Sequence, residues 1–305
     1  HDVSQPCGAC ALCSKVCGTD FDHIIGENRK CSVCSFECGV TAEHDWSGRD
    51  GVCKVCGYEC PEHSFDENYV CTICTYSYKA LIISEDGTSS TVYEFIDEAL
   101  TAAQSLENCT VKLLDNISAT TYCTIDSGKF TIDLNGKTWE SSQWVLSVSG
   151  TADIKITDST GEGGLMKTTV TTCDLISLYD TAKLEIAGGN FETSSVAVNM
   201  SYGGNATSAE LLISGGKITA NTCVYAQGSK VTITGGEFET IDRYIIYYIT
   251  GTLDLSQYAD ADKISFCVYP SADVSALNLI IPEGYVLIDN DTKEEVTQLE
   301  ADREY

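Results

Sequence analysis

The chain has 305 residues, of which 45 are acidic and 18 are basic, and its formal net charge at pH 7 is −27. This balance argues against binding to nucleic-acid backbones or to anionic lipid, because both need clustered Lys and Arg. No apolar run approaches the roughly 20 residues of a membrane-spanning helix, so we expect no membrane insertion.

Cysteine and histidine gather in the first quarter of the chain. Twelve of the 17 cysteines lie between Cys7 and Cys74, and all four histidines lie between His1 and His63. The chain starts at His1 and shows no signal peptide, so we expect a processed piece of a longer product. The change in composition predicts a Cys/His array over 1–78, a linker and helix over 79–108, a β domain over 109–290, and a tail or the start of another module over 291–305.

The cysteines and histidines of this array can be grouped into sets of four in two ways, if they bind metal ions. Grouping in chain order takes sets such as Cys31, Cys34, Cys38 and His44, but it leaves the last Cys-x2-Cys pair without partners. Interlaced grouping joins each Cys–His unit to the next Cys-x2-Cys pair. We prefer it because seven or eight residues always separate a histidine from that pair, which suggests a hairpin closing on one metal. The interlaced sets are His1, Cys7, Cys10, Cys13; Cys17, His23, Cys31, Cys34; Cys38, His44, Cys53, Cys56; and Cys60, His63, Cys71, Cys74.

Three thiolates with one imidazole form a closed tetrahedral set that favours zinc over iron. Such sites stabilise segments with too few apolar side chains to build a core. A disulfide framework is the alternative, but it does not explain why every histidine lies among these cysteines. We therefore expect about four structural zinc ions, with no open position for catalysis.

The next segment is predicted to be a single helix over 88–107. Thr91 and Glu94 would form its capping box. Apolar residues then recur at helical spacing on one face: Ile96, Ala99, Leu100, Ala103 and Leu106.

From Val111 to about residue 290 the sequence consists of short alternating strands. Three of them end in the same turn, which reads Ile186-Ala-Gly-Gly-Asn-Phe191, Ile213-Ser-Gly-Gly-Lys-Ile218 and Ile233-Thr-Gly-Gly-Glu-Phe238. A period of roughly 20 to 30 residues with several strands per repeat is typical of a solenoid. We predict a mainly β fold, a parallel β-helix with the helix capping its N-terminal end. A β-sandwich is the alternative.

Several strings of this β region resemble the opening of right-handed β-helix domains in large surface proteins of gut Gram-positive bacteria. They are Tyr93-Glu-Phe-Ile-Asp-Glu-Ala-Leu100, Val111-Lys-Leu-Leu-Asp115, Thr131-Ile-Asp-Leu-Asn-Gly-Lys-Thr138 and Ile156-Thr-Asp-Ser-Thr-Gly-Glu-Gly-Gly164. The Gly-Gly turns are similar to later coils of the same domains, and the array resembles zinc-ribbon-like repeats found near them. The resemblance covers about 88–290. It implies right-handed coiling, a cell-surface or extracellular location, and an adhesive or structural role.

Five cysteines lie outside the array: Cys109, Cys123, Cys173, Cys223 and Cys267. Cys173 and Cys223 have similar neighbours, so we predict that they stack at equivalent core positions as free thiols. A disulfide between coils is the alternative.

The β region lacks the residues that polysaccharide-cleaving β-helix enzymes use. It has no Asp-Asp pair and no histidine, and its only arginines are Arg243 and Arg303. We therefore expect no catalysis, with a polysaccharide lyase or hydrolase as the alternative.

Aromatic side chains on rigid strands suggest binding instead. Trp139, Trp144, Tyr244, Tyr247 and Tyr248 are candidates for contacting a glycan or a host or cell-surface protein, unless they belong to the core. We expect adhesion, carbohydrate binding or structural display outside the cell. Assembly into an extracellular fibre is a further alternative.

Overall fold

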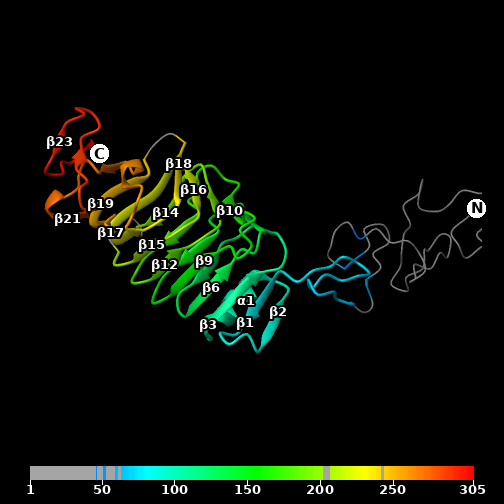
Figure 1. Cartoon of the computed structure of the whole chain (residues 1–305). Coiled ribbons are helices and arrows are strands. Elements are labelled where there is room, and N and C mark those ends of the chain that lie inside the picture. The colour runs from blue at the N-terminus through cyan, green and yellow to red at the C-terminus, as the bar shows by residue number, and fades with distance from the viewer. Residues whose placement is uncertain (1–45, 47–50, 53–58, 61–62, 202–206, 242–243) are drawn as a thin grey trace, which may run out of the picture. The chain divides into compact units, whose positions relative to one another are not determined.

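The computed structural model describes residues 46, 51–52, 59–60, 63–201, 207–241 and 244–305. The chain divides into two compact units, His1–Tyr78 and Lys79–Tyr305. The second unit is a β-solenoid of about seven turns, and its successive strands lie side by side (Figure 1). This confirms the predicted fold class, and the parallel strand pairing excludes a β-sandwich. The right-handed coiling stays a prediction. None of the described helices has the length and apolar character needed to cross a membrane.

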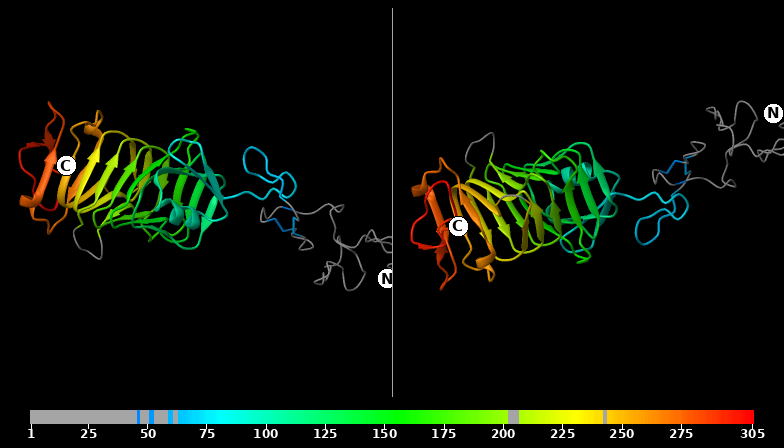
Figure 2. Two further views of the ribbon diagram at one scale, coloured as in Figure 1. Left: turned by 90° about the horizontal axis from the view of Figure 1, so that it is seen from below. Right: turned by 90° about the horizontal axis from the view of Figure 1, so that it is seen from above.

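Each coil contributes strands to three faces of the solenoid, named here A, B and C. Strands of one face pair in parallel between coils (Figure 2). Face A contains β3 (Glu107–Leu113), β6 (Lys129–Asp133), β9 (Asp153–Thr157), β12 (Lys183–Ile186), β15 (Glu210–Ile213), the second halves of β17 (Thr222–Ile233) and β19 (Ile246–Asp254), and β21 (Leu277–Ile280). Face B contains β4 (Ile117–Ala119), β7 (Thr138–Ser141), β10 (Leu165–Thr168), β13 (Asn190–Glu192), β16 (Lys217–Ala220) and β18 (Glu237–Thr240). Face C contains β5 (Cys123–Ile125), β8 (Leu146–Val148), β11 (Ile176–Leu178), β14 (Val196–Met200), the first halves of β17 and β19, and β20 (Phe266–Val268).

Inward side chains at equivalent positions of successive coils stack into ladders. On face A one ladder runs through Phe130, Ile154, Leu184, Leu211 and Val231, each in register with the next. All five are almost completely buried. Burying one such side chain stabilises the fold by about 1.5–3 kcal/mol, so the ladders supply the core that holds the coils in register.

The predicted Gly-Gly turns form corners between faces A and B. In each turn the second glycine has a positive φ: 91° at Gly189, 80° at Gly216 and 98° at Gly236. A Cβ on Gly216 would come within 2.8 Å of the carbonyl oxygen of Gly189 in the preceding coil. Glycine is needed here both for the backbone conformation and for the close stacking of the corners.

Two acidic residues in the strings that carry the family resemblance, Asp133 and Asp158, stabilise turns. The Asp158 carboxylate accepts hydrogen bonds from the backbone N–H groups of Gly136, Gly163 and Gly164. Burial opposes its ionisation, but these hydrogen bonds lower the pKa of Asp158 below its ordinary value. Asp133 accepts backbone hydrogen bonds from neighbouring turns in the same way. The stabilisation of turns therefore accounts for the presence of both carboxylates.

The N-terminal end is closed by a hairpin and a short helix, which corrects the predicted helix over 88–107. The helix α1 spans only Ile96–Ala103, and its N-cap is Phe95, without a side-chain cap. Thr91 lies instead in β2 (Ser90–Tyr93), which pairs antiparallel with β1 (Ala80–Ile83). The β-branched residues of β2 satisfy their backbone through this pairing, so no capping box forms. As predicted, α1 packs its apolar face into the core beside the first coil.

The C-terminal end is closed by residues for which a tail or the start of another module was predicted. Strand β24 (Arg303–Glu304) pairs antiparallel with β20, and Tyr305 is buried against Phe266. The hairpin of β22 (Leu287–Ile288) and β23 (Glu295–Val296) packs Leu287 and Val296 on the core. Short 3-10 helices at Ala261–Lys263 and Val274–Ala276 precede it. Residues 291–305 thus belong to the solenoid unit.

The prediction that Cys173 and Cys223 occupy equivalent positions is wrong. The strand register aligns Ile176 with Val198 and Val198 with Val224, which places Cys223 opposite Leu175, two residues beyond Cys173. Cys223 is fully buried and Cys173 only partly. All five cysteines of the solenoid are free, so the prediction of free thiols is confirmed.

In the last coils the corner between faces C and A disappears. Strands β17 and β19 each run through both faces, with a register shift where the corner would be. At this point Gly251 has a φ of 111° and packs against Ser229 of the preceding coil. Only glycine fits this position, because a Cβ would overlap the backbone of Ser229.

We expect Gly251→Ala to destabilise the solenoid by about 3 kcal/mol or more, since it adds a steric clash to an unfavourable φ. Gly161→Ala is the matched control: its φ is 65°, but nothing lies within 4 Å of the added Cβ, so about 1 kcal/mol is expected. Urea unfolding followed by circular dichroism measures both. Equal losses of unfolding free energy in the two variants would show that neighbouring coils can move apart at position 251 at no cost.

Candidate metal centre

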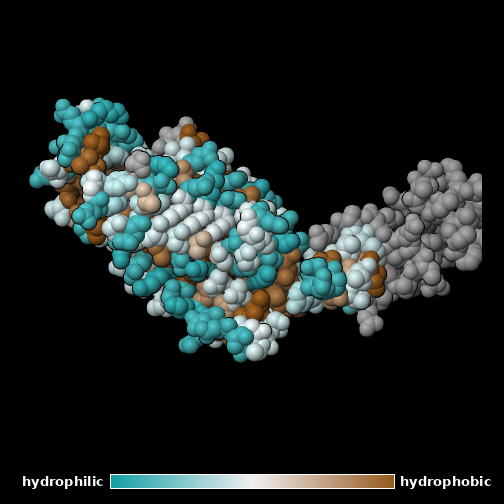
Figure 3. Space-filling model, viewed as in Figure 1, coloured by the Kyte–Doolittle hydropathy of each residue, from teal (hydrophilic) through white to brown (hydrophobic). Residues whose placement is uncertain are grey.

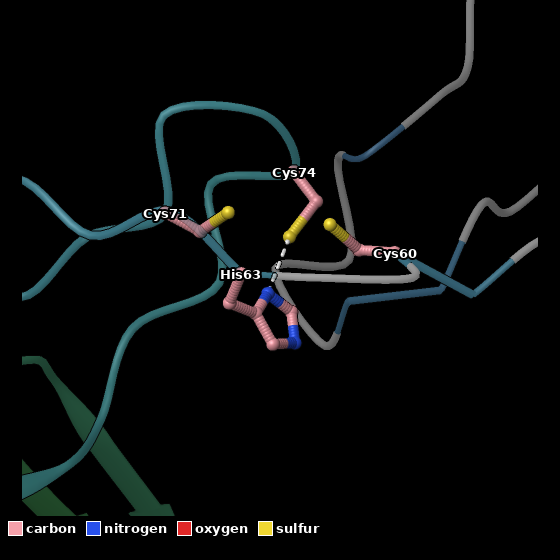
Figure 4. A group of neighbouring side chains, drawn as sticks. All are labelled: Cys60, His63, Cys71 and Cys74. Carbon is pink, nitrogen blue, oxygen red and sulfur yellow. Dashed lines mark hydrogen bonds between the residues drawn. The ribbon is translucent and has the colours of Figure 1, made fainter. Parts of the chain in front are cut away.

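Four side chains of the N-terminal unit converge on one point. The ligand atoms of Cys60, His63, Cys71 and Cys74 all lie within 4.8 Å of one another, and their thiols and imidazole point inward (Figure 4). Cys74 Sγ lies 3.3 Å from His63 Nδ1. The three cysteines are buried, whereas His63 is exposed. The membership is that of the fourth and last interlaced set, and it joins residues that the chain-order grouping separates.

A hairpin brings the two halves of this set together. Phe65 and Cys71 form an antiparallel bridge. Between them the Asp66 carboxylate accepts hydrogen bonds from the N–H groups of Asn68 and Val70, which fixes the turn. The nearly constant spacing between histidine and the next Cys-x2-Cys pair predicts such a hairpin, and at this site the prediction is confirmed.

The half of the site that contains Cys71 and Cys74 is a tight turn around their two thiols. The N–H of Cys71 donates to the carbonyl of Tyr76 at 2.7 Å, and the N–H of Thr75 donates to the carbonyl of Cys71 at 2.9 Å. Thr75 has a φ of 58°, an unusual conformation for a β-branched residue. This turn points the Cys71 and Cys74 thiols to the same side, as a shared metal requires.

Aromatic rings enclose the cluster, and sequence reasoning missed them. His63 stacks on Tyr76 with centroids 4.8 Å apart, and Trp46, Phe65 and Tyr76 pack on the buried cysteines. A Cβ on Gly51 would lie 3.1 Å from the His63 ring, so glycine leaves room for the imidazole. The available signal was the recurrence of aromatic residues on both sides of Cys71 and Cys74.

The pKa values of the Cys71 and Cys74 thiols shift in opposite directions. Burial opposes ionisation of Cys71, but backbone hydrogen bonds in the Cys-x2-Cys turn and the contact with His63 outweigh it and lower its pKa. Burial raises the pKa of Cys74, and the neighbouring thiols of Cys71 and Cys60 raise it further. A bound cation removes this repulsion, because a coordinated thiol is deprotonated.

The donor set fits a tetrahedral divalent metal. With Zn–S bonds of about 2.3 Å, neighbouring sulfurs would lie roughly 3.8 Å apart, slightly closer than the 4.8 Å limit of the cluster. Small movements of four side chains would close the set. The other twelve predicted ligands (His1, Cys7, Cys10, Cys13, Cys17, His23, Cys31, Cys34, Cys38, His44, Cys53 and Cys56) lie outside the described residues.

Two of the aromatic candidates for ligand binding are core residues. Trp139 and Tyr248 are both completely buried, and the Tyr248 hydroxyl donates to the carbonyl of Gly251. Trp139 lies at an inward position of face B, in register with Ile117 and Met166. Their predicted contact with a ligand is therefore wrong.

The other three candidates reach the surface. Trp144 is 38% exposed, and Tyr244 and Tyr247 are partly exposed on face C. The structure adds three residues that the sequence did not single out. Tyr122 packs on Trp144, and Tyr225 and Tyr269 pack on Tyr247. The coil register, which aligns Tyr225 with Tyr247, could have identified Tyr225.

Comparison of the chain with protein-family models, with curated proteins and with solved structures found no match.

Proposed function

We propose that the N-terminal unit is an array of structural zinc sites. The solenoid that follows is a rigid, non-catalytic module for binding and display on a bacterial cell surface or outside the cell. The observation that carries the proposal is the convergence of Cys60, His63, Cys71 and Cys74. Four protein ligands complete a tetrahedral shell and leave no position for a reacting water.

The small core of the N-terminal unit supports a structural role for the metal. At the described site only three buried cysteines and three partly buried aromatic rings pack together. A cluster of this size stabilises a fold weakly, whereas metal coordination can supply folding energy directly. The interlaced scheme extends the same chemistry to the three earlier sets, giving about four ions.

The solenoid supports display and binding better than catalysis. Its coils stack into a rigid body with continuous outer faces, which is how repeat proteins build extended binding surfaces. Two acidic residues of the resemblance strings, Asp133 and Asp158, accept turn hydrogen bonds. The adhesive role, the Gram-positive origin and the extracellular location rest on the family resemblance.

Native mass spectrometry of the whole chain, before and after a chelator, tests the metal part. We expect a mass excess equal to about four zinc ions, and chelation should remove it together with ordered structure in the first 78 residues. The same spectrum reports whether the chain assembles. A chelator-insensitive mass, lower by about two hydrogens per cysteine pair, would establish disulfides instead.

A further inference from the structure

The outward side chains of faces A and B are joined by ion pairs between neighbouring coils. The pairs are Lys129–Asp153, Lys155–Glu185 and Lys183–Glu210 on face A, and Lys167–Glu140 and Lys217–Glu239 on face B. Their N–O distances run from 2.9 to 3.4 Å. Each pair contributes little stability, but together they occupy both faces with charges that already have partners.

Face C is different, because its outward row carries no charge. The strand register aligns one residue from each coil, and we name this set the neutral row: Thr124, Ser147, Ser177, Asn199, Tyr225, Tyr247 and Cys267. Ser147 and Cys267 are almost fully buried, and the other five reach the surface. The accessible members of this row carry only hydroxyl, amide and phenol groups, although 21% of the residues of the chain are charged.

The C-terminal part of the neutral row is a cluster of tyrosines. The ring of Tyr247 lies 5.7 Å from that of Tyr225, 5.6 Å from Tyr244 and 5.3 Å from Tyr269, centroid to centroid. All four are partly exposed. Burial raises the pKa of Tyr225 and of Tyr247 above the ordinary value, so these phenols stay neutral at physiological pH.

The middle of the row presents fixed polar groups. The Asn199 side-chain amide donates to Asp174 at 2.6 Å, and its oxygen accepts from the backbone N–H and hydroxyl of Ser201. The other Asp174 oxygen accepts from Ser195 at 2.8 Å. These bonds hold the amide and the carboxylate in set orientations beside the tyrosines.

An exposed aromatic pair lies at the other end, at the corner that leads into face C. Trp144 is 38% and Tyr122 43% exposed, and their ring centroids are 5.0 Å apart. They belong to successive coils, since β5 pairs with β8. Aromatic rings thus flank a polar centre along one face of the solenoid.

We propose that face C binds a neutral, extended polysaccharide lying along the neutral row, across successive coils. This rests on the proposed function of the solenoid as a binding module and names its ligand class. The C–H faces of sugar rings stack on aromatic rings, and sugar hydroxyls exchange hydrogen bonds with amide, carboxylate and hydroxyl groups. The net charge of −27 repels anionic polymers. From Thr124 on β5 to Tyr247 on β19 the row spans roughly 24 Å at the usual strand spacing, enough for several sugar units.

Affinity electrophoresis of the whole chain in gels containing neutral mannan or neutral glucan tests the proposal, with polygalacturonate as the anionic comparison. We expect retardation by at least one neutral polymer and none by polygalacturonate. Tyr247→Ala should weaken retardation at least tenfold, whereas Tyr247→Phe, which keeps the ring, should retain it. Tyr285→Ala removes an exposed tyrosine outside face C and should change nothing. Thermal melting of each variant verifies its fold.

The outcomes separate this proposal from the broader one. If the wild type is retarded and Tyr247→Ala binds equally well, another surface binds the glycan; the neutral row is then excluded while a binding module remains. If no neutral polymer retards the wild type, or only polygalacturonate does, the assignment to neutral polysaccharide is overturned. The zinc array stands or falls separately, on its metal content.

Discussion

Replacing Cys74 with serine should remove one metal ion from the chain and unfold the segment around it. Cys74 is completely buried at the centre of the cluster, with its sulfur 3.3 Å from His63 Nδ1. A serine hydroxyl remains protonated near neutral pH and binds zinc poorly, so the site would be left with three ligands. Because coordination supplies the folding energy of such small units, the loss should reach the whole hairpin. Native mass spectrometry gives the metal count, and hydrogen exchange gives the protection of residues 63–78.

Cys173→Ser is the matched control for this experiment. Cys173 is a free, partly buried thiol of the solenoid and has no part in the cluster, so the metal count should stay at the wild-type value. A Cys74→Ser chain that keeps every ion and its protected hairpin would contradict the assignment of Cys74 as a ligand.

Trp139→Ala should destabilise the solenoid by about 3–5 kcal/mol, the usual cost of removing a large buried aromatic side chain. Trp139 is completely buried on face B. Among the described residues its indole Nε1 has no hydrogen-bond partner. An unpaired buried donor costs about 1–3 kcal/mol, so Trp139→Phe, which removes the donor and keeps most of the volume, should cost far less than alanine.

Urea denaturation followed by far-UV circular dichroism measures this pair of variants. Trp144→Ala is the control, because that side chain is 38% exposed and its loss leaves no buried cavity, so a change within about 0.5 kcal/mol is expected. A phenylalanine variant as unstable as the alanine variant would contradict the expectation that the buried ring volume sets the cost.

The sequence is informative where chemistry repeats. The strands of face A and the Gly-Gly corners could be predicted because successive coils repeat inward apolar residues and three of them repeat the same turn. Cys60, His63, Cys71 and Cys74 could be grouped because one hairpin length joins the histidine to the next Cys-x2-Cys pair. Both signals are local, and both recur along the sequence.

The predictions that the structure corrects are those that depend on which face of a strand a residue occupies, or on pairing between distant segments. Tyr247 and Tyr248 are neighbours, yet they point to opposite sides of the strand, and a short run that is apolar on both faces does not reveal its phase. The same ambiguity hides Trp139 in the core and misaligns Cys173 with Cys223. The helix expected from Thr91 onward begins later because β2 pairs with β1, a contact that no local pattern encodes.

The apolar side chains at the C-terminal end show what the end cap leaves uncovered. Ile280, Val286 and Ile288 remain exposed there, and apolar side chains gather near β21 and β23 in Figure 3. They line or adjoin a groove of about 510 Å³ between the last coil and the β22–β23 hairpin. The hairpin therefore closes the core without fully covering its own apolar side.

Each coil of this solenoid stacks only on the coils next to it, and this determines how the solenoid unfolds under tension. A force along its axis acts on one interface between coils at a time, so the end coil detaches while the others stay folded. Successive ladder positions such as Phe130, Ile154, Leu184 and Leu211 show that each detached coil frees roughly 20 to 30 residues, or roughly 70 to 100 Å of extended chain. A tether built in this way lengthens in steps and dissipates a sudden pull coil by coil.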